Sequence, residues 1–418
     1  MPRLLVLLAL VASALPAAAQ HDPEEEPLPF ELFQDRPGDG PSARYARLLA
    51  AAPEYAAGTQ AGDFVRQVLA QEAGALGDPE AALRWADATL SATRWDSVGT
   101  LPDGTRAVDA VAEIVRRAED ARFVMVNEAH HDASTRLLTL ALLEPLYARG
   151  YRYFAAETFF PDSVLAELPG YPTVGMGTYT DEPVFGAVVR EALRLGYTLV
   201  PYEVEEDDRV EGDSLSYQQR RDLSEARHLA DRTLGRDPDA RVLVHAGYGH
   251  VNEAPTAWFS PMADYFRQRT GLDPLTVEQT ELGPASEPAF EHPRYRAALG
   301  AGLVTDRPVV LLAADGAPLA PVGAEWTVDL QVLRPRLDGA PAEALGHGTI
   351  RPFELAEGCT PCVVEVRRLD EGPDAVPVDR RVVSEAVRLV GPRDVPLVVT
   401  VVEGETGALL DHRIVTAR

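Results

Sequence analysis

Cysteine is scarce in this chain, and its scarcity excludes several kinds of site. Only Cys359 and Cys362 occur among the 418 residues, in the sequence Cys-Thr-Pro-Cys. A zinc site needs about four ligands, and no second pair of cysteines is present to complete one. A thioredoxin-like redox pair would precede a helix, whereas Cys362 runs into the strand-like residues 363–366. The sequence therefore predicts a small structural disulfide between Cys359 and Cys362, which is typical of an oxidising compartment.

Basic side chains are also few compared with acidic side chains. The chain carries 39 basic and 65 acidic side chains, for a formal net charge of −26. Phosphate binding requires clustered cations that release counterions, so we do not expect nucleic acid as a partner. The negative charge favours solubility, with an acidic docking surface as the alternative. A small-molecule substrate is the partner that we expect.

Long apolar runs are confined to the N-terminus. Arg3 precedes the apolar run 4–15, and the small residues 16–19 follow it before Gln20. This pattern predicts a cleavable signal peptide at residues 1–19. A membrane anchor is the competing interpretation, but the run is shorter than the roughly 20 residues that a spanning helix needs. We therefore expect a secreted or periplasmic protein without a membrane segment after signal cleavage.

Several motifs that would define an enzyme class are missing. The chain has no Gly-x-Ser-x-Gly nucleophile elbow, no His-Glu-x-x-His, no P-loop and no dinucleotide-binding glycine fingerprint after the first expected strand. Each of these motifs supplies the groups that its enzyme class needs for catalysis or for binding its metal, phosphate or cofactor. Serine esterase, zincin, P-loop nucleoside triphosphatase and dehydrogenase interpretations are therefore excluded.

The remaining sequence predicts four further segments. Charged and Pro-rich residues at 20–42 indicate a flexible leader, and helical apolar spacing at 43–109 indicates a small helical region. Strand and helix patterns alternate at 110–284, which predicts an α/β fold with a mostly parallel sheet and flanking helices. Short β-type runs among Pro and Gly at 285–418 predict a β-rich C-terminal region.

Four expected strands run directly into an acid or a histidine. They cover residues 122–126, 151–156, 197–202 and 241–244. Parallel strands share one carboxyl edge, where ligands bind in such folds, so we expect the residues that follow them to line one pocket. The candidates at these strand ends are Glu128, His130, His131, Glu157, Glu203, His245, Tyr248 and His250.

These residue types suit proton transfer. Carboxylates held near histidines acquire shifted pKa values, although a lone histidine pair after a strand is often only hydrogen-bonded to turn carbonyls. Arg136 is spaced to clamp a carboxylate or an oxyanion, with a surface salt bridge as the alternative. Arg220 and Arg221, before a helix expected at 222–234, are weaker candidates of the same kind. The spacing of His245 and His250 around two glycines is not that of a helical zinc pair.

At these residues the chain resembles a known superfamily. The stretch Asn127-Glu-Ala-His-His131 with Arg136, then Glu157, then residues 244–250, is similar to the erythromycin-esterase and ChaN-like superfamily, which includes the TraB and Tiki proteins. The resemblance covers about residues 110–281. It implies a site built from Glu128, His131, Glu157, His245 and His250. The chain departs from the esterase pattern at Asn127, where glycine is usual, and in the wider spacing of the late histidines.

The resemblance and the strand-end residues together lead to one hypothesis. His131 is the general base on a water, Glu128 orients it, and Glu157 is the acid or proton partner. His250 and Arg136 stabilise the developing oxyanion. The residues expected to bind substrate are His130, Arg136, Glu203, His245 and Tyr248. Two alternatives remain open: a haem- or divalent-metal-binding protein that uses the same histidines, as the ChaN and Tiki branches imply, and a degenerate enzyme with a structural role.

Overall fold

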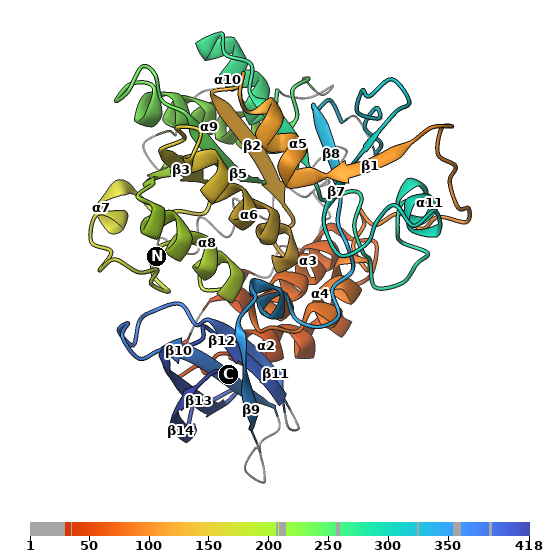
Figure 1. The fold of residues 1–418 in the computed structure, drawn as a ribbon. Coiled ribbons are helices and arrows are strands. Elements are labelled where there is room, and N and C mark those ends of the chain that lie inside the picture. The colour runs from red at the N-terminus through yellow and green to blue at the C-terminus, as the bar shows by residue number, and fades with distance from the viewer. Residues whose placement is uncertain are drawn as a thin grey trace.

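The computed structural model describes residues 30–34, 36–205, 208, 215–255, 260–323, 326–353, 361–383 and 387–418 (Figure 1). The expected signal peptide at 1–19 lies outside these residues. None of the helices in the described ranges combines the length and the apolar character that a bilayer crossing requires.

The centre of the molecule is an eight-stranded sheet in the order β1-β7-β8-β6-β2-β5-β3-β4. The six strands from β8 to β4 pair in parallel, whereas β7 is antiparallel to both of its neighbours. The fold is therefore the α/β fold with a mostly parallel sheet that the sequence predicts. The strands are β1 (Arg106–Asp109), β2 (Phe123–Glu128), β3 (Tyr153–Ala156), β4 (Thr198–Pro201), β5 (Val242–Gly247), β6 (Leu275–Glu278), β7 (Val309–Leu312) and β8 (Leu330–Leu333).

Helices cover both faces of this sheet. Strand β2 shows why: Val124 and Val126 pack into one apolar core with α5, α6 and α8, while Phe123 and Met125 pack into another with α9 and α10. Successive side chains of a strand point to opposite faces, so a continuously apolar strand needs helices on each side (Figure 1). The helices are α5 (Ala110–Arg117), η3 (Ala133–Thr135), α6 (Arg136–Tyr147), α7 (Asp162–Leu165), α8 (Pro183–Leu195), α9 (Tyr217–Thr233), η5 (Tyr248–Val251), α10 (Met262–Thr270) and α11 (Pro293–Gly300).

The large sheet extends beyond residues 110–284 on both sides. Strand β1 comes from the end of the expected helical region, and β7 and β8 come from the start of the expected β-rich region. Every residue of β7 and β8 is buried. Their apolar runs are therefore core strands of the α/β sheet, and the separate C-terminal β structure begins only after β8.

The N-terminal segment is helical and packs against the rest of the chain. Phe33 is buried edge-on against Phe64, with ring centroids 4.8 Å apart. The backbone N–H groups of Gly40 and Ser42 donate to the carbonyls of Glu405 and Gly404. The described residues of the expected leader, 30–34 and 36–42, are therefore anchored by these contacts. The elements here are η1 (Phe30–Phe33), α2 (Ala43–Ala51), η2 (Ala52–Glu54), α3 (Gln60–Ala75) and α4 (Pro79–Ala86).

The C-terminal region forms two small sheets, in the orders β11-β10-β13-β14 and β12-β9. It contacts the α/β part through an isolated bridge between Thr173 and Ala375 and through the ion pair of Arg190 with Glu371. Cys362 begins β10, is buried and is bonded in a disulfide, while Cys359 lies outside the described residues. The elements are η6 (Pro341–Leu345), β9 (Gly348–Phe353), β10 (Cys362–Arg368), β11 (Asp379–Val383), β12 (Val387–Gly391), β13 (Pro396–Glu403) and β14 (Leu409–Thr416).

Candidate functional site

Glu128, the last residue of β2, is the centre of a buried polar group. One carboxylate oxygen accepts from His130 Nδ1 at 2.9 Å, and the other lies 2.6 Å from Arg136 Nε and 3.0 Å from His245 Nε2. Burial opposes ionisation of Glu128, but Arg136 and His245 outweigh it and hold the pKa of this carboxyl well below its ordinary value. An ionised Glu128 accepts the Nδ1 proton of His130, which leaves the lone pair of His130 on Nε2.

His130 therefore presents an accepting nitrogen to the interior of the site. Its Nε2 is buried and has no hydrogen-bond partner among the described residues. The nearest carboxylate oxygen that it faces is Oε1 of Glu157, 4.0 Å away. The ring of Tyr179 stacks on the imidazole at 4.7 Å, and the ring of Tyr248 meets it edge-on at 5.0 Å. The imidazole is thus fixed in orientation while one of its nitrogens stays unpaired.

Gly247 at the end of β5 makes room for this histidine. A Cβ atom at position 247 would lie 2.5 Å from His130 Cε1 and 2.6 Å from His130 Nε2. The backbone N–H of Gly247 also donates to Glu157 Oε2 at 2.5 Å. The sequence suggests that this glycine allows a tight turn or the close approach of a ligand; in the structure it allows the close approach of His130.

Arg136 has a different role from the one expected. It is fully buried at the start of α6 and is bonded to Glu128, to Glu182 at 2.9 Å and to the carbonyl of His130 at 3.3 Å. These carboxylates also raise its pKa above the ordinary value despite burial. Its donors are engaged with the protein, so the expected clamp on a substrate carboxylate or oxyanion is not supported. Arg136 instead fixes Glu128 and the residues that begin α8.

A second buried group surrounds Arg221 of α9. The guanidinium lies 2.6 Å from Glu157, 2.7 Å from Glu203, 3.0 Å from Glu225 and 2.9 Å from His250 Nε2. Burial opposes its charge, but the three carboxylates hold the pKa of Arg221 well above its ordinary value. The Arg221 charge also keeps the pKa of Glu157 low, at about 2, against the effect of burial. Arg221 thus joins the ends of β3 and β4 to α9.

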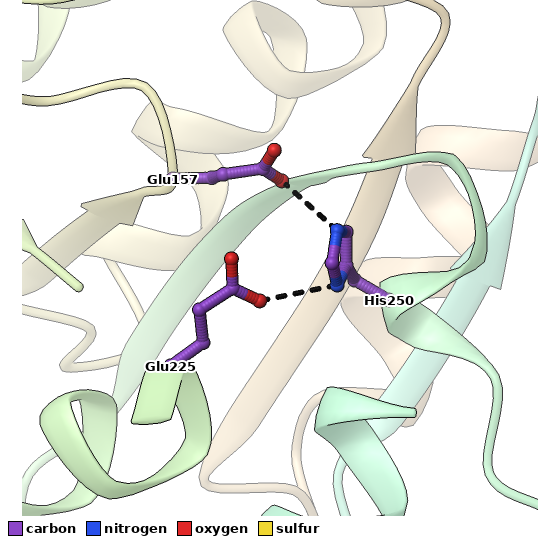
Figure 2. A group of neighbouring side chains, drawn as sticks. All are labelled: Glu157, Glu225 and His250. Atoms are coloured by element: carbon purple, nitrogen blue, oxygen red, sulfur yellow. Dashed lines mark ion pairs between the residues drawn. The ribbon is translucent and has the colours of Figure 1, made fainter. Parts of the chain in front are cut away.

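His250 lies against two carboxyl groups within this second group. Figure 2 shows Glu157, Glu225 and His250 turned toward one another from three separate segments. His250 Nδ1 lies 2.8 Å from Asp222 and 3.1 Å from Glu225. Burial disfavours the imidazolium, but these carboxylates outweigh it and hold the pKa of His250 well above its usual value. Burial raises the pKa of Glu225 to about 8. The side chain of His250 is therefore engaged with the protein, and its expected role on a substrate oxyanion is not supported.

His131 does not contact Glu128, contrary to expectation. Its Nδ1 lies 3.1 Å from the hydroxyl of Tyr248, and burial lowers its pKa to about 4 although Asp132 acts in the opposite direction. Both histidines lie in the turn after β2, and the turn directs His130 Nδ1 to Glu128 and His131 Nδ1 to the Tyr248 hydroxyl. The carboxylate orients the first histidine of the pair and leaves the second outside the Glu128 group.

Four residues of these two groups were not candidates from the sequence: Tyr179, Glu182, Asp222 and Glu225. Helix α9 begins at Tyr217 with a capping box formed by Ser216 and Gln219, five residues earlier than expected. Arg221, a weak candidate from the sequence, therefore lies inside the helix, one turn from Glu225, and an Arg–Glu pair at this spacing is usually a surface pair. Arg220, one position earlier, donates to the Leu215 carbonyl at 3.1 Å. Only the burial of Arg221 and Glu225 under β3, β4 and β5 distinguishes this pair from a surface pair.

A metal ion or a haem would have to bind the side chains of these two buried groups. Ligand atoms of Glu157, Glu225 and His250 lie within 4.8 Å of one another. However, the guanidinium of Arg221 contacts all three, and a divalent cation would have to displace this permanent positive charge. A haem would have to reach His130 Nε2, which is buried 4.0 Å from Glu157. The residues present therefore do not fit either group without rearrangement.

The chain is similar to several solved structures, among them the two that follow. No family model and no curated protein matches the chain. The type III effector HopBA1 aligns over 46% of this chain and 90% of its own, at 16% identity and a TM-score of 0.30. The C-terminal region of Pasteurella multocida toxin, described as having a thiol-protease like catalytic triad, aligns over 70% of this chain and 46% of its own, at 11% identity and a TM-score of 0.30. These likenesses are too low to support an argument about the site.

Proposed function

We propose that this protein is an exported hydrolase that activates water with His130 and acts on ester or amide bonds. The observation that carries the proposal is the unpartnered Nε2 of His130, buried opposite Glu157 while Nδ1 is held by Glu128. This arrangement has the parts of a general base and its orienting carboxylate, as in the serine-protease triad but without the serine. The proposal includes membership of the erythromycin-esterase and ChaN-like superfamily, for which the strand-end residues are the support.

In this proposal His130, Glu128 and Glu157 each have a task. The lone pair on His130 Nε2 takes a proton from water as the water oxygen attacks the carbonyl carbon. The ionised Glu128 stabilises the imidazolium that forms, because its charge lies 2.9 Å from Nδ1. Glu157, also ionised, holds a second hydrogen of the same water and aims its oxygen. When the bond to the alcohol or amine breaks, His130 returns the proton to the leaving group.

Water is the nucleophile that suits this set of residues. Cys362 is bonded in a disulfide in the C-terminal sheet. The hydroxyl of Thr139 contacts the Nδ1 of His245 at 2.9 Å and is thereby engaged. A direct attack by water requires no covalent intermediate, so we expect turnover without a burst phase.

Paired substitutions of the two adjacent histidines test the proposal. The purified protein is assayed against a panel of 4-nitrophenyl and alkyl esters and peptide anilides. His130→Ala should lower turnover by roughly 10² to 10⁴, the range for lost acid–base catalysis. His131→Ala should lower it less than about tenfold, since His131 contacts Tyr248 and not Glu128. The reverse ranking would assign the base to His131, and no turnover of any substrate by the wild-type protein would refute hydrolysis.

Export is a separate part of the proposal. The support is the apolar run 4–15 with its small-residue end, and the disulfide at Cys362 suits an oxidising compartment. The mature protein should begin near Gln20. Mass spectrometry of the protein recovered from its native compartment checks this expectation, and an intact residue 1 in that material would contradict it.

A further inference from the structure

The site needs a donor for the carbonyl oxygen of a substrate, and its two arginines do not supply one. Arg136 and Arg221 lie at most 1% exposed and are bonded to carboxylates. His250 is bonded to Asp222 and Glu225. Water attack nevertheless places negative charge on the substrate oxygen, and catalysis requires a hydrogen-bond donor aimed at that position.

Tyr179 carries a donor that has no partner. Its ring stacks on the imidazole of His130, with the planes 20° apart. Its hydroxyl is buried and has no hydrogen-bond partner among the described residues. A buried hydroxyl without a partner costs about 1–3 kcal/mol, and a substrate oxygen that accepts from it would offset this cost. The hydroxyls of Thr158 and Thr178 also lack partners, but no contact joins either of them to His130.

The backbone around Tyr179 is held in an unusual conformation. Tyr179 has a φ of 57°, in the left-handed region that side chains other than glycine rarely adopt. The chain is fixed on both sides of it. The Thr178 N–H donates to the Thr158 carbonyl at 2.9 Å, and Glu182 joins Arg136 to the first N–H groups of α8. Strain of this kind persists where the surroundings impose it, and it clusters at functional sites.

We propose that Tyr179 is a catalytic residue that donates its hydroxyl hydrogen bond to the carbonyl oxygen of the substrate during water attack. The inference rests on the proposed hydrolysis by His130. Water attacks the carbon, its proton moves to His130 Nε2, and the carbonyl π electrons move on to the oxygen that Tyr179 binds. These electrons re-form the carbonyl when the alcohol leaves, and the leaving oxygen takes the proton from His130. Burial, with Glu157 and Glu128 adding to it, holds the pKa of Tyr179 well above its ordinary value, so the phenol keeps its proton and remains a donor.

Removal of the single hydroxyl tests this role. Tyr179→Phe keeps the ring over His130 and should lower kcat by roughly 10² to 10³, as for the loss of one oxyanion donor, with little change in KM. Tyr171→Phe is the matched control, because Tyr171 lies in the same loop and its hydroxyl donates to Asp374 at 3.4 Å; its kcat should equal that of the wild type. The loss in Tyr179→Phe should be the same factor for a 4-nitrophenyl and an ethyl ester, since the donor serves the carbonyl oxygen and not the leaving group.

The outcomes separate this inference from the proposed function. Wild-type turnover that His130→Ala abolishes, together with undiminished turnover in Tyr179→Phe, would overturn the role of Tyr179 alone. Full activity in Tyr179→Phe with loss in Tyr179→Leu would show that only the stacked ring matters, which also overturns the donor role. A loss confined to the ethyl ester would assign Tyr179 to the leaving group and contradict the proposal. No turnover by the wild type would overturn both the hydrolase and its donor.

Discussion

The raised pKa of Glu225 makes a specific prediction about stability. Its pKa is about 8 in the fold against 4.5 for an ordinary glutamate, so the folded protein holds a proton that the unfolded chain releases above pH 4.5. The contribution of Glu225 to stability therefore falls as pH rises from about 4.5 to 8, because at this group the folded state binds more protons than the unfolded state. At about 1.4 kcal/mol for each pH unit, Glu225 contributes a loss of roughly 2 kcal/mol between pH 5 and 6.5 and up to about 5 kcal/mol by pH 8.

Glu225→Gln isolates this effect, since glutamine mimics the protonated carboxyl at every pH. Urea unfolding at pH 5, 6.5 and 8 should show that the variant loses less stability than the wild type over this range. Glu253 and Glu281, whose pKa values burial raises to about 7, decrease stability with pH in both proteins, so the difference between the two curves is the diagnostic quantity. Asp231→Asn, which changes an exposed residue of the same helix, is the control. Parallel pH curves for the wild type and Glu225→Gln would refute the buried proton.

Three further predictions concern the same two groups. Arg221→Met should lower the free energy of unfolding by about 3–5 kcal/mol at pH 7, because it leaves buried carboxylates without their partner, and a urea midpoint equal to that of the wild type would contradict this. Gly247→Ala should reduce turnover by at least tenfold, since its Cβ would lie 2.5 Å from His130 Cε1 and acid–base catalysis contributes roughly 10² to 10⁴. Gly249→Ala is the control and should behave as the wild type, because no atom of the described residues lies within 4 Å of its Cβ. Turnover should be unchanged after exhaustive chelation, because Arg221 occupies the position of a cation, and recovery of lost activity by an added divalent ion would overturn that assignment.

The sequence predicted the parallel strands of the sheet because the signals for them are local. The apolar runs before Glu128, Glu157 and His245 form parallel strands β2, β3 and β5, and the parallel arrangement brings their carboxyl ends to one edge. Each of these expectations depends on periodicity or on one residue's backbone preference, which short stretches of sequence contain.

The sequence alone determined that acids and histidines gather at the carboxyl edge of an α/β sheet. Only the tertiary structure decided which of them are paired. Glu128 orients His130 and not His131, Arg136 is engaged by Glu182 from a distant helix start, and Arg221 with Glu225 joins the site from α9. The physical reason is that hydrogen-bond partners and charge compensation depend on distances between side chains far apart in the chain. Burial then makes each unpaired group either costly or functional, and burial is a property of the packed molecule.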